Sequence, residues 1–141
     1  MTSTLKVDKI EGVSTAGSIS ITGEGNSTTT NLQQGLLKVW HNFDGAESTP
    51  ATRDSFNTSG ITDHGTGDYA LTIVNDFANV NYVANCDNES GNGDLARIYG
   101  EGSANGRYET GIFRIYVFNA TSGSGVTDAN IVTAMLAGDL A

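Results

Sequence analysis

Apolar and polar residues alternate along several short segments of this chain with a period of two. Residues 5–10 and 18–21 alternate in this way, and side chains two positions apart lie on the same face of a β-strand. We expect both segments to form half-buried strands. Residues 23–30 contain only Gly, Glu, Asn, Ser and Thr, which is typical of a linker. The pattern therefore predicts an N-terminal segment with its linker over residues 1–30 and a distal domain over residues 31–141.

The distal domain contains apolar runs of strand length, separated by Gly, Ser, Asn and Asp. The clearest runs cover residues 36–43, 69–74, 80–84 and 95–99. At residues 112–118 both faces of the expected strand are largely apolar, which favours a strand in the centre of a sheet. Residues 130–136 would also suit a helix, but the β-branched side chains at 131–133 favour a strand.

The expected fold is all-β, an antiparallel and jelly-roll-like β-sandwich that follows a short extended β-segment. Short strands joined by Gly-rich turns suit a sandwich whose two inner faces supply the core. Only 38% of the 141 residues are hydrophobic and 18 are Gly, so the core must be small. Because a partner chain would cover additional apolar area, the composition favours an oligomer.

Charge and cysteine content narrow the range of partners. The net charge of −9 repels phosphate backbones, so we expect no nucleic acid partner. It also opposes adsorption to an acidic cell surface unless cations or neutral sugars mediate the contact. Cys86 is the single cysteine, and the absence of an intrachain disulfide indicates assembly in a reducing cytoplasm. The first ten residues lack the apolar core of a signal peptide, and we expect no membrane insertion.

Several stretches resemble a pattern that recurs in tail fibre and appendage proteins of marine tailed bacteriophages, especially those that infect cyanobacteria. They read TLKVDKI at residues 4–10, WHNFDG at 40–45, RDSFNTSGITDHGTGDY at 53–69 and GVTDA at 125–129. The resemblance extends over most of the chain, although residues 76–107 are covered only loosely.

The resemblance implies a homotrimeric virion protein that is assembled in the host cytoplasm. Its N-terminal segment would join other tail or capsid proteins, and its distal sandwich would recognise a glycan or protein on the host surface. The alternative is a purely structural virion component, such as a head fibre, a capsid decoration or an adaptor, which binds no receptor.

Four large side chains are expected to anchor the core or the trimer interface. Trp40 and Phe43 lie in an apolar run, and a Trp buries roughly 200 Å² when it is enclosed. A sugar-stacking platform is the alternative for Trp40. Ile112 and Tyr116 share one face of the expected central strand, and with the apolar residues of segment 5–10 they would be buried between subunits.

The polar residues between the first two apolar runs of the domain are expected to form structural turns. Arg53 and Asp54 precede a stretch rich in small polar side chains, where a guanidinium can bind carbonyls and a carboxylate can accept amides. A tight turn should then lead into the strand at residue 69, with glycines free to take positive φ. The residues of this turn are Asp63, Gly65, Gly67 and Asp68.

Two polar segments rich in Gly and Asn, residues 87–94 and 100–106, are expected to form loop tips that face a receptor. The candidate contact residues are Asp87, Asn88, Glu89, Asn92, Asp94 and Asn105. Segment 87–94 concentrates carboxylates as a calcium loop does, but it lacks the spacing and the terminal Glu of an EF-hand. An exposed loop is therefore favoured over a metal site.

We expect neither catalysis nor a cofactor. Residues 65–70 and 91–96 match a Gly-x-Gly-x-x-Ala pattern, yet each leads into an expected strand, whereas the dinucleotide-binding motif leads into a helix. The two histidines belong to no Cys/His cluster that could bind zinc. Ser55, His64 and Asp54 could be combined into a catalytic triad only with an arbitrary geometry. A carbohydrate-active enzyme is the least favoured hypothesis.

Overall fold

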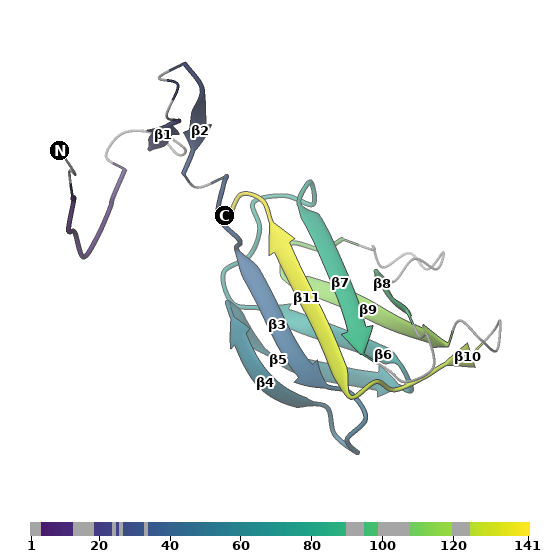
Figure 1. Ribbon diagram of the computed structural model, residues 1–141. Helices are drawn as coiled ribbons and strands as arrows, with labels where there is room; N and C mark the ends of the chain where they lie inside the picture. Colours follow the sequence, from purple (N-terminus) through teal and green to yellow (C-terminus); the bar gives the residue numbers. More distant parts are fainter. Residues whose placement is uncertain are drawn as a thin grey trace. The chain divides into compact units, whose positions relative to one another are not determined.

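The computed structural model describes residues 4–12, 19–23, 25, 27–32, 34–89, 95–98, 108–119 and 125–141. The chain divides into two compact units, Met1–Leu36 and Leu37–Ala141. All regular elements among the described residues are β-strands (Figure 1), and every pairing between them is antiparallel. The prediction of an all-β, antiparallel chain is confirmed.

The N-terminal unit contains one pair of short strands, β1 (Ser20–Thr22) and β2 (Thr29–Asn31). Residues 4–12 form no strand, and the side chain of Leu5 is 81% exposed. Ile21, in the middle of β1, is exposed as well. The strand expected at residues 18–21 is confirmed by β1, whereas the strand expected at residues 5–10 is absent. The prediction that these segments are half-buried is wrong for the single chain, because two short strands offer no layer on which apolar side chains could pack.

The expected linker at residues 23–30 is shorter than predicted, because its last residues belong to β2. The β-branched Thr29 and Thr30 suit a strand, and Thr30 pairs with Ile21. The chain then turns at Asn31, whose carbonyl accepts a hydrogen bond from the Gly35 amide at 3.1 Å. The division between the units falls after Leu36, whereas the sequence placed it after residue 30.

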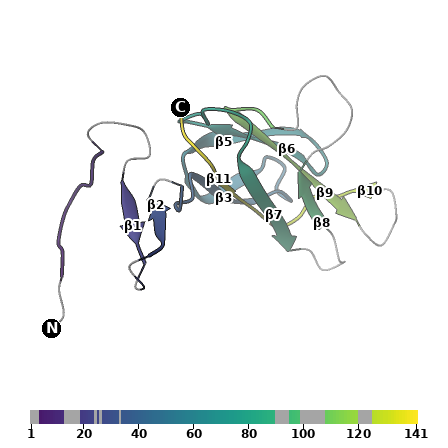
Figure 2. The same ribbon diagram turned by 90° about the horizontal axis from the view of Figure 1, so that it is seen from above.

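The second unit consists of two sheets. The four-stranded sheet has the order β4 (Ala51–Phe56), β3 (Val39–Asp44), β11 (Ile131–Ala137) and β7 (Val83–Glu89). The five-stranded sheet follows the order β10 (Gly125–Val126), β9 (Ile112–Asn119), β6 (Asp68–Ile73) and β5 (Thr58–Gly65), and β8 (Leu95–Ile98) also pairs with β9. In Figures 1 and 2 the two sheets lie as separate layers.

Strand β9 is central in its sheet, as its two apolar faces predicted. It pairs with β6 along residues 112–116 and with β8 along residues 115–118. Because these pairings overlap, β6 and β8 must lie on opposite edges of β9. The last apolar run of the chain is strand β11 rather than a helix, which confirms the choice made from its β-branched residues.

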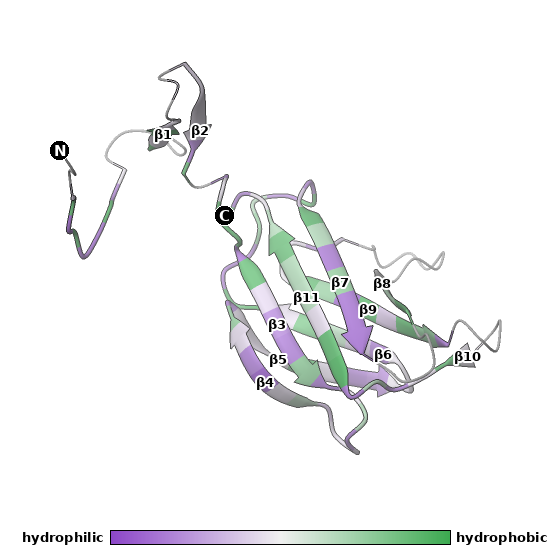
Figure 3. Cartoon of the chain, in the orientation of Figure 1, coloured by the Kyte–Doolittle hydropathy of each residue, from purple (hydrophilic) through white to green (hydrophobic). Residues whose placement is uncertain are grey.

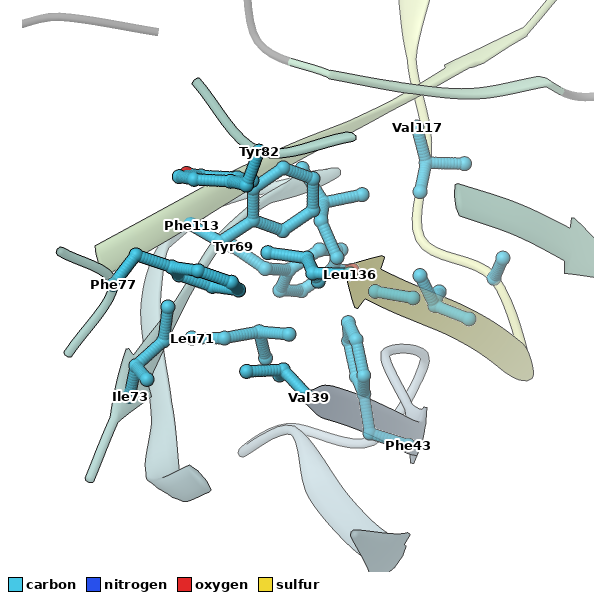
Figure 4. Packing of buried hydrophobic residues seen from close by; sticks show 14 residues of the cluster. Val39, Phe43, Tyr69, Leu71, Ile73, Phe77, Tyr82, Phe113, Val117 and Leu136 are labelled. Atoms are coloured by element: carbon cyan, nitrogen blue, oxygen red, sulfur yellow. The ribbon is translucent and has the colours of Figure 1, made fainter. Parts of the chain in front are cut away.

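The two sheets share one hydrophobic core, so that the second unit is a β-sandwich (Figure 4). Along β3 and β11 buried residues alternate with partly exposed ones, and Figure 3 shows hydrophobic residues along much of β11. Phe43 of the four-stranded sheet packs edge-on against Tyr69 of the five-stranded sheet, with ring centroids 5.1 Å apart. Burying a side chain such as Phe43 contributes about 1.5–3 kcal/mol.

Strands β4 and β5 lie where the sequence predicted polar turns. All six residues of β4 are exposed or partly exposed, so this edge strand has no apolar alternation by which it could be recognised. Asn57 separates the two strands with a φ of 59°, a left-handed conformation that Asn tolerates better than most residues. The chain crosses from one sheet to the other at this residue.

The side chain of Asn57 holds this crossing in place. Its Oδ1 accepts a hydrogen bond from the Asn75 amide at 2.8 Å, and its Nδ2 donates to the Lys38 carbonyl at 3.0 Å. Asn75 follows β6 and Lys38 precedes β3. One side chain therefore connects the ends of strands from both sheets.

A second connection between the sheets is made by the hydroxyl of Tyr69. Its oxygen lies 2.6 Å from Asp128 Oδ1 and 2.9 Å from the carbonyl oxygen of Gly45. The Gly67 amide donates to the same carboxylate oxygen at 2.7 Å. Burial and, next, the hydrogen bond to Asp128 raise the pKa of Tyr69 above its ordinary value, so the phenol stays protonated and acts as a donor. We call these four residues the tyrosine network.

Two glycines of the tyrosine network leave no room for a side chain. A Cβ at Gly45 would lie 2.6 Å from the Tyr69 hydroxyl oxygen. A Cβ at Gly67 would lie 2.7 Å from the carbonyl oxygens of Val117 and Thr127, and Gly67 also has a positive φ of 65°. The close approach of the Tyr69 side chain at Gly45, and of two backbone carbonyls at Gly67, requires glycine at both positions.

The substitution Tyr69→Phe should lower the free energy of unfolding by about 1–3 kcal/mol, because it removes a hydrogen bond to a carboxylate. Chemical denaturation at a fixed protein concentration measures this loss. Tyr108→Phe is the matched control, since no hydrogen bond of the Tyr108 hydroxyl occurs within the described residues, and its effect should stay within about 0.5 kcal/mol. Equal losses in the two variants would contradict the role given to the tyrosine network.

Gly67→Ala should destabilise the sandwich by more than about 2 kcal/mol, because the added methyl group meets backbone oxygens and the positive φ is strained. Gly60→Ala is the control, since a Cβ at Gly60 meets nothing within 4 Å. Thermal unfolding followed by circular dichroism compares the two variants. A Gly67→Ala protein that melts at the temperature of Gly60→Ala would show that the close approach at this turn is not needed.

Candidate functional site: the outer face of the four-stranded sheet

Exposed apolar side chains form a row across the outer face of the four-stranded sheet. Trp40 on β3 pairs with Phe56 on β4 and with Met135 on β11, so the three side chains follow one another across three strands. Phe56 is 53% exposed, Met135 is 45% exposed and Trp40 is partly exposed. We call these three residues the apolar row. Neighbouring strands are about 4.8 Å apart, so the row is about 10 Å long.

A second row, parallel to the first, consists of polar side chains. Asn42 pairs with Asp54 on β4 and with Thr133 on β11, which in turn pairs with Asp87 on β7. We call these four residues the polar row. It follows the apolar row by two positions along β3, a distance of about 6.8 Å. Aromatic and hydrogen-bonding groups are therefore placed side by side on one face.

The carboxylates at the two ends of the polar row have free hydrogen-bonding capacity. Asp54 Oδ1 accepts a hydrogen bond from the Ser55 amide at 2.8 Å, and Asp87 Oδ1 accepts one from the Asn88 amide at 2.9 Å. A carboxylate can accept about four hydrogen bonds. The other oxygen of each group thus remains available to a ligand, as far as the described residues show.

Beyond the polar row, Arg53 and Asp44 form an ion pair between β4 and β3. Arg53 Nη2 donates to Asp44 Oδ2 at 2.6 Å. This hydrogen bond is the main cause that holds the pKa of Asp44 below its ordinary value. Arg53 and Asp54 belong to strand β4, and the prediction that they precede a loop is therefore wrong. Their strand has no apolar pattern by which it could have been found.

The inner face of β3 contains a buried histidine that the sequence did not single out. His41 is 2% exposed, and its Nδ1 and Nε2 lie 2.7 Å from Thr58 Oγ1 and 3.0 Å from Thr52 Oγ1. Either tautomer can be satisfied, because a hydroxyl both donates and accepts. Burial lowers the pKa of His41 below its ordinary value, so the ring is neutral at neutral pH.

The expected anchors lie in different environments. Phe43 is fully buried in the core, whereas Trp40 lies on the outer face and does not belong to the core. The core alternative for Trp40 is therefore wrong, and the interface and sugar-platform alternatives remain. Ile112 and Tyr116 share the outer face of β9, where Ile112 is 40% exposed.

The expected turn before Tyr69 is a hairpin between β5 and β6. Asp63 Oδ1 accepts a hydrogen bond from the Gly65 amide at 2.8 Å, and both Gly65 and Gly67 have positive φ. Asp68 begins β6, and both of its carboxylate oxygens accept hydrogen bonds from Arg114 Nη2, at 2.7 and 2.8 Å. Arg114 belongs to β9, and only the folded sheet reveals this partner.

Half of the candidate receptor residues do not lie in a loop. Asp87, Asn88 and Glu89 belong to strand β7, an edge strand whose polar outer face was mistaken for a loop tip. Asn92, Asp94 and Asn105 lie outside the described residues, as do residues 100–106. The structure instead places Asp87 in the polar row, together with Asp54.

The residues considered for catalysis are not brought together. His64 belongs to β5 of one sheet, whereas Ser55 and Asp54 belong to β4 of the other. No group of three His, Cys, Asp or Glu side chains within the described ranges could hold a metal ion. Burial raises the pKa of the Cys86 thiol to about 11, so it is not a nucleophile at neutral pH.

The comparisons with known proteins give no family or relative for this chain. No family model, no curated protein and no solved structure matches it. None of the described residues belongs to a helix that is long and apolar enough to cross a membrane. The function must therefore be inferred from the two units and from the outer face of the sandwich.

Stability should fall when the pH is lowered from 7 to 5.5, because of His41. Its pKa in the folded chain lies below the ordinary 6.5, so the unfolded chain binds the proton first as the pH falls. The loss begins near pH 6.5 and ends below the pKa of the folded state. Melting temperatures across this range measure it. His41→Gln should give a flatter profile, and His64→Gln, at an exposed position, should keep the wild-type slope. If the melting temperature of His41→Gln depends on pH as steeply as that of the wild-type protein, His41 is not the cause of the loss of stability.

Proposed function

We propose that this chain is a subunit of a homotrimeric tail fibre or tail-tip appendage of a tailed bacteriophage. Its N-terminal unit joins other tail or capsid proteins, and its sandwich faces the host surface and takes part in attachment. The observation that carries this proposal is the division of the chain into a sandwich with its own core and an N-terminal unit that exposes its apolar residues. The resemblance of residues 4–10, 40–45, 53–69 and 125–129 to such appendages supports it.

The exposed N-terminal residues support the trimer. Leu5, Val7 and Ile10 are all more than half exposed in the single chain. Leaving such side chains in water forgoes about 1.5–3 kcal/mol for each one. Three copies of an extended segment can bury them against one another around a shared axis, which a single copy cannot do. The N-terminal unit thus gains a core when it is assembled.

The outer face of β9 offers a second contact for the trimer. Ile112 is 40% exposed there, and Tyr116 and Phe118 continue the same face, with ring centroids 5.7 Å apart. Aromatic side chains are enriched at protein interfaces. The proposal places this face between subunits and leaves the four-stranded sheet, on the other side of the core, free to meet the host.

We infer further that the topology of the sandwich is jelly-roll-like. The pairing of β3, the first strand of the unit, with β11, its last, supports this topology. Location in the virion after assembly in the host cytoplasm is supported by the resemblance and by the single, partly buried Cys86. The net charge of −9 favours protein or neutral glycan partners over nucleic acid.

Ile112→Asp should dissociate the trimer, because a charge placed between subunits has no partner there. Native mass spectrometry at a fixed concentration measures the fraction of trimer. Val80→Asp is the matched control, since Val80 is also about half exposed but lies outside β9, and it should leave the mass unchanged. An Ile112→Asp protein that stays folded and trimeric would exclude β9 from the interface.

Removal of residues 1–36 should leave a folded sandwich that no longer joins the particle. The core residues all lie within 37–141, so the near-UV circular dichroism of the sandwich should persist. Incorporation into virions is measured by complementing a phage that lacks its own copy of the gene. Phe56→Ala, which changes only the sandwich surface, serves as the control and should be incorporated normally. Normal incorporation of the truncated chain would exclude the attachment role.

A further inference from the structure

The apolar row lies on a face of mixed polarity. The other outer positions of β3, β11 and β7 include the polar residues Asn42, Asp44, Thr133, Asp87 and Glu89, together with Val83, which is 70% exposed, and the partly exposed Ile131 and Ala137. A contiguous group of exposed large apolar side chains often marks an interaction site. Trp40, the only tryptophan of the chain, lies in the middle of this group, between Phe56 and Met135.

We propose that the apolar and polar rows together bind a neutral glycan of the host surface. The proposal rests on the proposed function, in which the four-stranded sheet faces the host. The flat faces of Trp40 and Phe56 carry negative charge density, which attracts the C–H groups on one face of a pyranose ring. Met135, beside Trp40, is a flexible side chain that adapts to the shape of its ligand.

The polar row supplies the directional contacts. Asp54 and Asp87 lie at its two ends, three strand spacings or about 14 Å apart. Their free carboxylate oxygens accept hydrogen bonds from sugar hydroxyls, and such charge-assisted bonds are roughly twice as strong as neutral ones. The indole N–H of Trp40 has no hydrogen-bond partner among the described residues, so it can donate to a ring or hydroxyl oxygen. A distance of 14 Å fits an oligosaccharide rather than a single sugar.

The charge of this face determines which glycan fits. Asp44 is paired with Arg53, but Asp54, Asp87 and Glu89 form no ion pair among the described residues. These carboxylates, together with the net charge of −9, repel uronic acids, sialic acids and phosphorylated sugars. A neutral glycan meets no such repulsion and can use every carboxylate as an acceptor.

A second copy of the chain fits this face less well. A stable protein interface buries about 800 Å² on each partner. The three side chains of the apolar row fall short of that area, since even a fully buried aromatic residue contributes only about 150–250 Å². Two copies that met through this face would also bring their unpaired carboxylates together. The glycan is therefore the preferred occupant.

The fluorescence of Trp40 provides a direct test, because no other tryptophan contributes to the signal. The full-length protein is first applied to an array of neutral and acidic cell-surface glycans, and its emission is then titrated with the captured oligosaccharides. Neutral glycans should be captured, and they should change the emission of Trp40 saturably. Phe56→Ala should weaken binding at least tenfold and Asp54→Asn at least threefold, whereas Val80→Ala, at an exposed apolar position elsewhere, should leave it unchanged.

Two binding results would overturn the proposal: a failure to capture any neutral glycan, whether or not acidic glycans are captured, or full binding by Phe56→Ala. A lower oligomer mass in Phe56→Ala would also overturn it, since the row would then belong to a subunit contact. The mass of the wild-type protein separates this inference from the proposed function. If the protein is a trimer that binds no neutral glycan, only the proposal of a glycan site is refuted. If it is a monomer that binds a neutral glycan through Trp40, only the proposal of a trimeric appendage is refuted.

Discussion

The hydrogen bond between the Tyr69 hydroxyl and the Asp128 carboxylate, at 2.6 Å, joins the two sheets at the edge of the core that they share. It fixes the end of one sheet against the start of the last strand of the other, at a point where Gly45 makes room for the Tyr69 ring and Gly67 lets two backbone carbonyls approach closely. All four residues of the tyrosine network lie at the edge of the core, so the outer face of the four-stranded sheet takes no part in it.

The sequence predicted those elements whose apolar side chains decide their position. Strands β6, β9 and β11 have strong apolar patterns and were found. Strands β4 and β5 were missed because each lies at the edge of its sheet, where a strand can be polar and still pair through the backbone. The same reason explains why the end of β7 was mistaken for a loop. The tyrosine network joins residues that are far apart in sequence, and no local pattern indicates it.

Trp40 shows why the candidate site could not be located from the sequence. If Trp40 were buried, Val39 and Phe43 would face outward, because neighbouring residues of a strand face opposite sides of the sheet. The inward face contains His41, a residue that hydropathy alone would not place in a core, and its two threonine partners make the burial possible. Once that histidine is inside, Trp40 must lie outside. The alternation of side chains along β3 therefore places Val39, His41 and Phe43 in the core and Trp40 in the proposed glycan site on the other face.

The central claim is that the single chain is incomplete, with an N-terminal unit whose apolar residues are covered only in a trimer. The most direct test is the mass of the full-length protein in solution, by native mass spectrometry or light scattering, with and without EDTA. The account predicts a stable species of three times 14.7 kDa that persists after chelation. A monomer at concentrations where virion proteins assemble would contradict it.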